Sequence, residues 1–372
     1  MTQQRITRRE FVRDTAAGAA ALAAGMSLVR VGNLEAADTS RIVNYNPDME
    51  YRLCGKTGWM ISSVCLGGHW KRIVQIIGGQ GIGDYGGNIA RPDFQQNRYD
   101  VVTRCIQRGI NYIDACTHDE TQAYSQALKG RRDKMHLGWS WYENEARRGD
   151  RRTVEALGPT LEEGMRQAKE EYVDLWRITC CVDGSRGPDG KYIMTHTPAE
   201  SEGIAAALDK AKKSGKARKT GVSSHDRVWL SYMIEKFPDQ IDVVVTPYTA
   251  RSKVLEKDSF FDSVRKCNCG FFGIKPFASG SAFKGDSSPK SPQREEDDRI
   301  ARLAIRYILC NPAITAPIPG LITPQQVDNV ALAVKERREL DVQEKAELEG
   351  AMDRAWANLP AHYQWLKEWE YV

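Results

Sequence analysis

The amino-acid sequence predicts an α/β fold in which one (β/α)8 TIM barrel follows an N-terminal β-hairpin and precedes a C-terminal helical and aromatic tail. Two observations support this prediction. Short apolar runs alternate with amphipathic segments along most of the chain, which is the pattern of βαβ units around a parallel sheet. Eight such pairs fit within about 290 residues, a length typical of a single barrel.

The predicted elements follow one another in chain order. Two short β-type runs, 49–53 and 61–66, form the hairpin around the turn 55–58. The barrel strands are expected at 63–67, 111–115, 135–141, 174–181, 219–223, 242–247, 270–276 and 313–319. Apolar residues recur at helical spacing in 154–172, 201–214, 295–310 and 324–334. We therefore expect the barrel to occupy residues 49–337, with the tail, residues 338–372, packed on it.

Composition and charge exclude two classes of function. The chain is 41% hydrophobic and 27% charged, as in globular proteins, and no apolar run is long enough to span a bilayer. The formal net charge is only +4, and acidic residues separate the basic clusters. We therefore expect neither a stable membrane span nor a nucleic-acid partner.

The amino terminus carries a candidate targeting signal. Arg8 and Arg9 are paired, Phe11 follows two residues later, and a weakly hydrophobic Ala/Gly-rich stretch covers 15–29. This arrangement is typical of a twin-arginine export signal, and an N-terminal helix is the alternative interpretation. Residues 1–40 are therefore assigned to a signal and linker. The expected location is the periplasm, and the twin-arginine export machinery is an expected partner.

The cysteines do not predict a metal centre. Nine are present, an odd number, so they cannot all form disulfides within one chain. Neither Cys267 and Cys269 nor the adjacent pair Cys180 and Cys181 has a partner cluster with zinc or iron–sulfur spacing. We expect no metal site, and the pairing of any disulfides stays open.

Asp114 is the first candidate site residue. It lies at the C-terminal end of the predicted strand 111–115, and active sites of (β/α)8 barrels are built at that end of the strands. The alternative is an aspartate that caps a helix or fixes a loop.

The order of several motifs resembles the aldo/keto reductase family. The segments that carry the resemblance are 51–58, 65–68, 109–114, 128–134, 172–175, 221–224, 275–280 and 318–320. The resemblance implies a barrel that binds NAD or NADP and transfers hydride to or from a small carbonyl or hydroxyl substrate. It assigns cofactor binding to Gly67, Gly68, Ser223, Ser224, Lys275, Pro276, Phe277, Ser279, Gly280, Pro319, Gly320, Gln326 and Asn329.

The family's catalytic group is incomplete in this chain. In the family, an aspartate, a tyrosine, a lysine and a histidine together supply the proton. Asp114 is kept, but the loop that should carry the tyrosine reads Thr-His-Asp-Glu at 117–120. Ser140 stands at the lysine position and Thr179 at the histidine position. Tyr124 is expected to pack on a helix, and Tyr142 is a weaker substitute.

His118 is the candidate replacement for the missing proton donor. An imidazole titrates near neutral pH, and a neighbouring carboxylate, Asp114 or Asp119, would raise its pKa. The alternative is a solvated loop histidine. Cys116 could be a nucleophile or a buried side chain, and His225 could line the rim of the pocket. Trp139, Trp141 and Trp176 indicate either an aromatic pocket or a filled core.

The predicted function is nicotinamide-dependent oxidoreduction by an exported protein, with a sugar-like substrate as one candidate. Residues 321–329 contain no Lys or Arg to hold a 2′-phosphate, which favours NAD over NADP. The alternatives are a pseudoenzyme barrel that binds a ligand or partner without redox chemistry, and a cofactor-independent acid–base enzyme.

Overall fold

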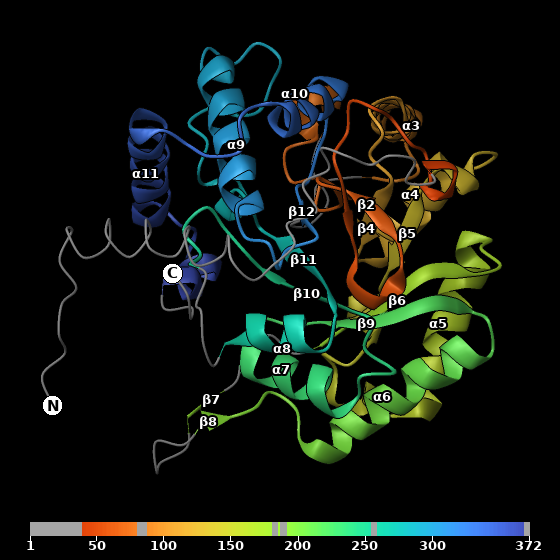
Figure 1. Cartoon of the computed structure of the whole chain (residues 1–372). Helices are drawn as coiled ribbons and strands as arrows, with labels where there is room; N and C mark the ends of the chain where they lie inside the picture. The colour runs from red at the N-terminus through yellow and green to blue at the C-terminus, as the bar shows by residue number, and fades with distance from the viewer. Residues whose placement is uncertain (1–38, 80–87, 181–184, 187–191, 254–258, 368–372) are drawn as a thin grey trace, which may run out of the picture. The chain divides into compact units, whose positions relative to one another are not determined.

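The computed structural model describes residues 39–79, 88–180, 185–186, 192–253 and 259–367 (Figure 1). Most of the predicted signal, 1–40, lies outside these residues. The short 3-10 helix η1 (Thr39–Arg41) belongs to an amino-terminal unit, and residues from 42 onward form a second compact unit. Within the described residues, no helix has both the length and the apolar character needed to cross a membrane.

Eight parallel strands form the centre of the second unit, in the order β12-β11-β10-β9-β6-β5-β4-β3. A parallel bridge between Gly67 and Gly320 joins the two edge strands, and Gly67 N donates to Pro319 O at 2.8 Å. The predicted (β/α)8 barrel is therefore confirmed. The strands are β3 (Leu66–Gly67), β4 (Tyr112–Ala115), β5 (His136–Trp139), β6 (Val173–Thr179), β9 (Ala217–Ser223), β10 (Val243–Pro247), β11 (Gly270–Ile274) and β12 (Ala316–Ile318).

The predicted hairpin consists of β1 (Tyr51–Leu53) and β2 (Met60–Ser62), which pair antiparallel. The second hairpin strand ends at Ser62, so the predicted overlap of hairpin and barrel strand at 63–66 is wrong. Ser62 Oγ donates to Val64 O, which turns the chain before β3 begins. An additional hairpin, β7 (Ser185–Arg186) with β8 (Tyr192–Ile193), lies between β6 and α6.

Helices surround the ring of strands (Figure 1). Thr117 with Glu120 and Thr197 with Glu200 form capping boxes at the starts of α4 and α6. The α-helices are α2 (Val74–Ile77), α3 (Pro92–Gln107), α4 (His118–Ala127), α5 (Val154–Ala168), α6 (Pro198–Lys213), α7 (Arg227–Lys236), α8 (Phe260–Lys266), α9 (Arg294–Leu309), α10 (Pro324–Lys335) and α11 (Val342–Ala357). The 3-10 helices are η2 (Gly55–Thr57), η3 (Arg132–Lys134), η4 (Tyr142–Asn144), η5 (Gly149–Arg151), η6 (Ala278–Gly280) and η7 (Ala361–Lys367).

The core has two parts. A small cluster that includes Tyr112, stacked on Phe272 with ring centroids 4.4 Å apart, fills the interior of the barrel. A larger cluster packs the outer faces of the strands against the helices, and it includes Trp139 and Trp176, both fully buried. These two tryptophans are therefore core residues and do not line a pocket.

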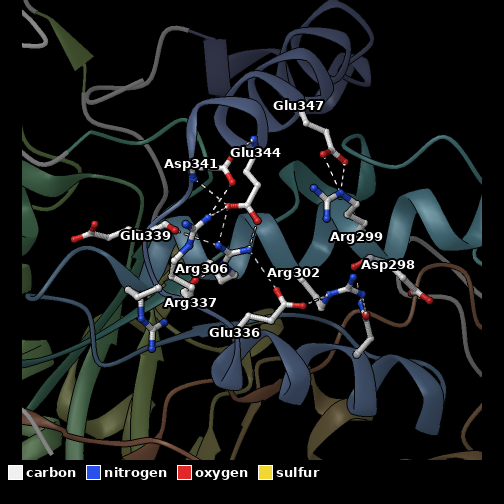
Figure 2. A network of polar contacts seen from close by, with 12 residues as sticks. Asp298, Arg299, Arg302, Arg306, Glu336, Arg337, Glu339, Asp341, Glu344 and Glu347 are labelled. Atoms are coloured by element: carbon white, nitrogen blue, oxygen red, sulfur yellow. Dashed lines mark hydrogen bonds and ion pairs between the residues drawn. The ribbon is translucent and has the colours of Figure 1, made fainter.

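A network of charged side chains attaches α11 to α9 and α10 (Figure 2). Arg306, on α9, is buried and donates to both carboxylate oxygens of Glu344 at 2.8 and 2.9 Å. It also donates to the backbone carbonyls of Arg337 and Glu339. The hydrogen bond from Arg306 lowers the pKa of Glu344 to about 2, so this carboxylate is charged. The network places the start of the tail, and η7 follows α11.

We expect replacement of Arg306 by methionine to lower the free energy of unfolding by about 3 kcal/mol or more, because it leaves buried acceptors without their donor. Unfolding in urea would measure the change. Arg299→Met is the matched control, since Arg299 pairs with Glu347 but is 43% exposed. The Arg299→Met variant should lose less than about 1 kcal/mol of its free energy of unfolding. Equal losses in the two variants would contradict the structural role of Arg306.

Candidate functional site

One cavity of about 650 Å³ opens at the C-terminal ends of the barrel strands. Its walls come from the loops that follow most of the strands and from η7. All thirteen residues that the resemblance assigns to a cofactor line this cavity: Gly67, Gly68, Ser223, Ser224, Lys275, Pro276, Phe277, Ser279, Gly280, Pro319, Gly320, Gln326 and Asn329. Asp114 lines it as well. The fold thus brings together residues that are more than 250 positions apart in the chain.

Asp114 forms a buried ion pair with Arg177 of β6. Arg177 donates through Nε to Oδ1 at 2.8 Å and through Nη2 to Oδ2 at 2.5 Å. Tyr112 also donates its hydroxyl to Asp114 Oδ1, at 3.2 Å. Burial opposes the charge of Arg177, but Asp114 more than compensates and raises its pKa. The aspartate is thus held by an arginine where the resemblance implies a lysine. A cation within the apolar strand 173–179 was the sequence signal for it.

A hydrogen-bonded network occupies the positions expected for the catalytic lysine and histidine. The hydroxyls of Ser140 and Thr179 lie 2.7 Å apart, and Ser140 donates to Glu145 at 2.5 Å. Arg177 Nη1 donates to Thr179 Oγ1 at 2.8 Å, which connects this network to Asp114. Glu145 is buried, and burial raises its pKa despite these hydrogen bonds. No lysine or histidine takes part in this network.

Glu120 and His69 form a second buried carboxylate contact at the cavity. His69 follows β3 and lines the cavity, with 33% of its side chain exposed. Its Nδ1 lies 2.6 Å from Glu120 Oε1, and the backbone N–H of His69 donates to the same oxygen. Cys116 N donates to Glu120 Oε2 at 2.7 Å. A Cβ on Gly68 would lie 2.0 Å from the Glu120 carboxyl carbon, so this approach requires glycine.

The ionic state of Glu120 sets the tautomer of His69. Burial raises the pKa of Glu120, but His69 and the backbone N–H groups outweigh burial and lower it. The carboxylate therefore accepts a hydrogen bond from Nδ1–H, and Nε2 lies 3.8 Å from Cys116 Sγ. Sequence reasoning missed both residues. Their only signals were a histidine after Gly67-Gly68 and a glutamate at the third position of α4.

A metal ion fits this cluster poorly. The ligand atoms of His69, Cys116 and Glu120 lie within 4.8 Å of one another. Two ligands on one zinc ion, each at roughly 2.1 Å from it, would sit more than about 3 Å apart. The 2.6 Å contact between His69 and Glu120 is a hydrogen-bond distance. Burial also raises the pKa of the Cys116 thiol, which disfavours the thiolate that a metal or a nucleophilic role requires.

His118 does not enter the cavity. It is the first residue of α4, and its ring stacks on Trp141 at a centroid distance of 4.3 Å. Neither residue is among those that line the cavity. Burial lowers the pKa of His118 more than Asp119 raises it, so the expected upward shift is wrong. Tyr124 is buried and donates to Gly67 O at 2.6 Å, which makes it a packing residue, as expected.

We expect Asp114→Asn to destabilise the protein by about 3–5 kcal/mol, because it leaves the buried guanidinium of Arg177 without a counter-charge. The double variant Asp114→Asn/Arg177→Met should lose much less than the sum of the two single variants. Urea unfolding of the four proteins completes the cycle. Glu163→Gln, in an exposed pair with Arg166, is the control and should leave the free energy of unfolding close to that of the unmodified protein. Additive losses at Asp114 and Arg177 would contradict the buried pair.

Comparison with known proteins identifies the family. The model of the aldo/keto reductase family matches residues 76–353, about three-quarters of the chain. The chain is similar to the holo form of aldo-keto reductase AKR11C1 from Bacillus halodurans, with 16% identity, a TM-score of 0.55, and coverage of 85% of this chain and 99% of that chain. It is also similar to an aldo-keto reductase from Klebsiella pneumoniae in complex with NADPH, with 15% identity, a TM-score of 0.55, and coverage of 81% and 94%.

No curated protein matches the chain. At such low identity, the solved structures show a shared fold, whereas the family match rests on the sequence itself. With its eight-stranded barrel and its sequence match over residues 76–353, the chain belongs to the aldo/keto reductase family.

Proposed function

We propose that the barrel binds a nicotinamide dinucleotide and transfers hydride to or from a carbonyl or hydroxyl compound. One observation carries the proposal: thirteen residues expected to hold the cofactor share a single cavity with a histidine–carboxylate pair suited to proton transfer. The NADPH complex of the Klebsiella pneumoniae relative supports the same cofactor class.

The donors in the cavity suit a dinucleotide. Ser223 and Ser224 offer hydroxyls, and Lys275 offers a cation. Residues 278–280 have φ angles of 47°, 59° and 86°, three left-handed residues in succession. Backbone in this unusual conformation, at a cavity wall, is typical of anion-binding loops. The loop is thus a candidate for the pyrophosphate. Gln326 and Asn329 are candidates for the adenosine end.

Arg72 supports retention of a bound cofactor. It follows β3, and its Nη1 donates to Gly285 O at 2.7 Å and to Ser287 Oγ at 3.1 Å. All three residues lie next to or in the wall of the cavity, so the arginine connects two loops across it. A protein exported in the folded state would need such retention, because the cofactor must be loaded before export. Export to the periplasm remains part of the proposal, and Arg8 and Arg9 lie outside the described residues.

His69 is the proposed proton donor and acceptor, in place of His118. Glu120 fixes its tautomer and orientation, as a carboxylate does for a catalytic imidazole. Arg177, held by Asp114, lines the same cavity and supplies a fixed positive charge for a developing oxyanion. The nicotinamide, when bound, supplies or accepts the hydride.

The choice between NAD and NADP depends on more than residues 321–329. Arg294, at the start of α9, lines the cavity together with Gln326 and Asn329, and so do Asp297 and Asp298. The arginine could hold a 2′-phosphate, whereas a carboxylate would favour the free 2′-hydroxyl of NAD. A sugar-like substrate is supported only by aromatic side chains that line the cavity, among them Tyr142, Tyr363 and Trp365.

The pseudoenzyme alternative is favoured by one observation. The network of Ser140, Thr179 and Glu145 is complete without the lysine and histidine of the family, and Asp114 is fully engaged by Arg177. A barrel with this arrangement could bind a ligand without redox chemistry.

We expect the full chain, purified without added nucleotide and then denatured, to release about one dinucleotide per chain. Mass spectrometry of the released material would distinguish NAD from NADP. If the purified protein is empty, titration with each dinucleotide, followed by tryptophan fluorescence, should show binding. Failure in both measurements would eliminate the oxidoreductase function and leave a binding barrel.

We expect His69→Gln to lower kcat by roughly 10²-fold or more, the usual contribution of a positioned acid–base group, without weakening dinucleotide binding. Oxidation of the reduced dinucleotide by a panel of aldehydes, ketones and aldoses would provide the assay. His118→Gln should retain activity because His118 lies outside the cavity wall. The reverse result would restore His118 as the proton donor, and no turnover by the unmodified protein would favour the pseudoenzyme.

A further inference from the structure

Two lysines, Lys71 and Lys275, line the cavity. Lys71 lies in the segment after β3, and Lys275 directly follows β11. Both line the cavity, and within the described residues neither forms an ion pair with an acidic side chain. The two buried carboxylates nearby are already engaged, Asp114 by Arg177 and Glu120 by His69. Among the described residues, these two ammonium groups therefore carry positive charge that no ion pair balances, while Asp297 and Asp298 also line the cavity.

The ammonium groups of both lysines lie close to one aromatic ring of the tail, that of Tyr363. Lys71 Nζ donates to the hydroxyl of Tyr363 at 2.7 Å and lies 4.4 Å from its ring centroid. Lys275 Nζ lies 5.1 Å from the same centroid. The two charges are therefore within one Debye length of each other, about 10 Å at 0.1 M salt. Burial, together with the charges of Lys71 and Arg147, lowers the pKa of Lys275.

The surrounding side chains place this charge near the middle of the barrel mouth. His225 follows β9, and its ring stacks on Trp365 of the tail at 4.2 Å. Arg147 follows β5, lines the cavity and is close enough to Lys275 and His225 to oppose their protonation. Segments after β3, β5 and β11 thus contribute cations to one region beneath η7, whereas burial lowers the pKa of His225, after β9, and keeps its ring neutral. Gln326 and Asn329, at the proposed adenosine end, lie on α10, after β12.

Two like charges held together in a partly buried cavity repel one another, which raises the electrostatic free energy of the protein. An anion that binds between them offsets this repulsion. We propose that the substrate is an anionic carbonyl or hydroxyl compound, whose carboxylate or phosphate is bound between Lys71 and Lys275 beneath Tyr363. This inference rests on the proposed oxidoreductase function and names its substrate class. Tyr363 accepts a hydrogen bond from Lys71, and its hydroxyl also forms a hydrogen bond with Ser279.

An oxyanion bound by these lysines could come from either of two molecules. One is the substrate, through its carboxylate or phosphate, and the other is the dinucleotide, through its pyrophosphate. The position of Lys71 favours the substrate. It lies outside the loop 275–280 that is the candidate for pyrophosphate, and it contacts the tail rather than that loop's backbone. Lys71 is therefore the residue to change, because Lys275 borders both regions.

The test uses isothermal titration of the full chain saturated with the dinucleotide that it binds. D-glucuronate and D-glucose form a probe pair that differs in the carboxylate, and inorganic phosphate is the third probe. We expect D-glucuronate to bind at least about tenfold more tightly than D-glucose, and Lys71→Met to remove most of this difference. Lys71→Arg should restore it. Lys129→Met, at an exposed lysine outside the cavity wall, should bind like the unmodified protein.

Three outcomes would overturn the inference. The first is equal affinity for the two sugars, and the second is unchanged D-glucuronate binding by Lys71→Met. The third combines two results: Lys71→Met weakens dinucleotide binding as much as it weakens D-glucuronate binding, and bound dinucleotide abolishes the binding of phosphate. Together they would assign the lysines to the pyrophosphate of the dinucleotide. A chain that binds no dinucleotide, yet binds D-glucuronate through Lys71, would refute the redox function and keep the anion site.

Discussion

The buried ion pair between Asp114 and Arg177 is the constraint on which the site depends. Removing two charges from water is expensive, so each must be matched by a partner in good geometry. The two parallel hydrogen bonds between the guanidinium and the carboxylate provide that match, and Tyr112 satisfies one more carboxylate site. Once Arg177 occupies this position, its Nη1 donates to Thr179 and orients it. Thr179 is hydrogen-bonded to Ser140, which in turn donates to Glu145. Ser140 and Thr179, at the positions where the resemblance implies the lysine and the histidine, are thus hydrogen-bonded to their neighbours.

Glu120 organises the other side of the site in a similar way. It caps α4, accepts the backbone N–H groups of His69 and Cys116, and holds the imidazole of His69. One carboxylate thus connects the loops after β3 and β4 to a helix amino terminus, where negative charge is favoured. The result is an oriented histidine at the cavity wall. We propose this histidine, which lies on a different loop from the expected tyrosine, as the proton-transfer group.

The tail completes the cavity. The charged network of α9, α10 and α11 holds the segment from which η7 continues, and Tyr363 and Trp365 then line the cavity. Their rings contact the ammonium groups of Lys71 and Lys275 and the imidazole of His225. The packing of α11 and the shape of the cavity are therefore linked through η7, the short segment that follows this helix.

Much of the fold could be predicted from the sequence. The alternation of apolar runs and amphipathic segments located all eight strands, with errors at their ends: β3 begins at Leu66 rather than 63, and β12 at Ala316 rather than 313. These errors arise because hydrogen bonding to the neighbouring strand, not apolar character, decides where a strand begins. The sequence also located Asp114 at a strand end and showed that the tyrosine, lysine and histidine positions are changed.

What the sequence determined by itself was thus the barrel and the residues of a cavity whose motifs are local. Tertiary structure decided which side chains meet. His69 and Glu120 are 51 positions apart, Asp114 and Arg177 are 63 apart, and Lys71 and Tyr363 are 292 apart. His118 was the natural choice from the sequence because it is near Asp114 in the chain, yet α4 directs it to Trp141. The physical reason is that periodicity and spacing report the local conformation of the chain, whereas these contacts depend on closure of the barrel and on the path of the tail.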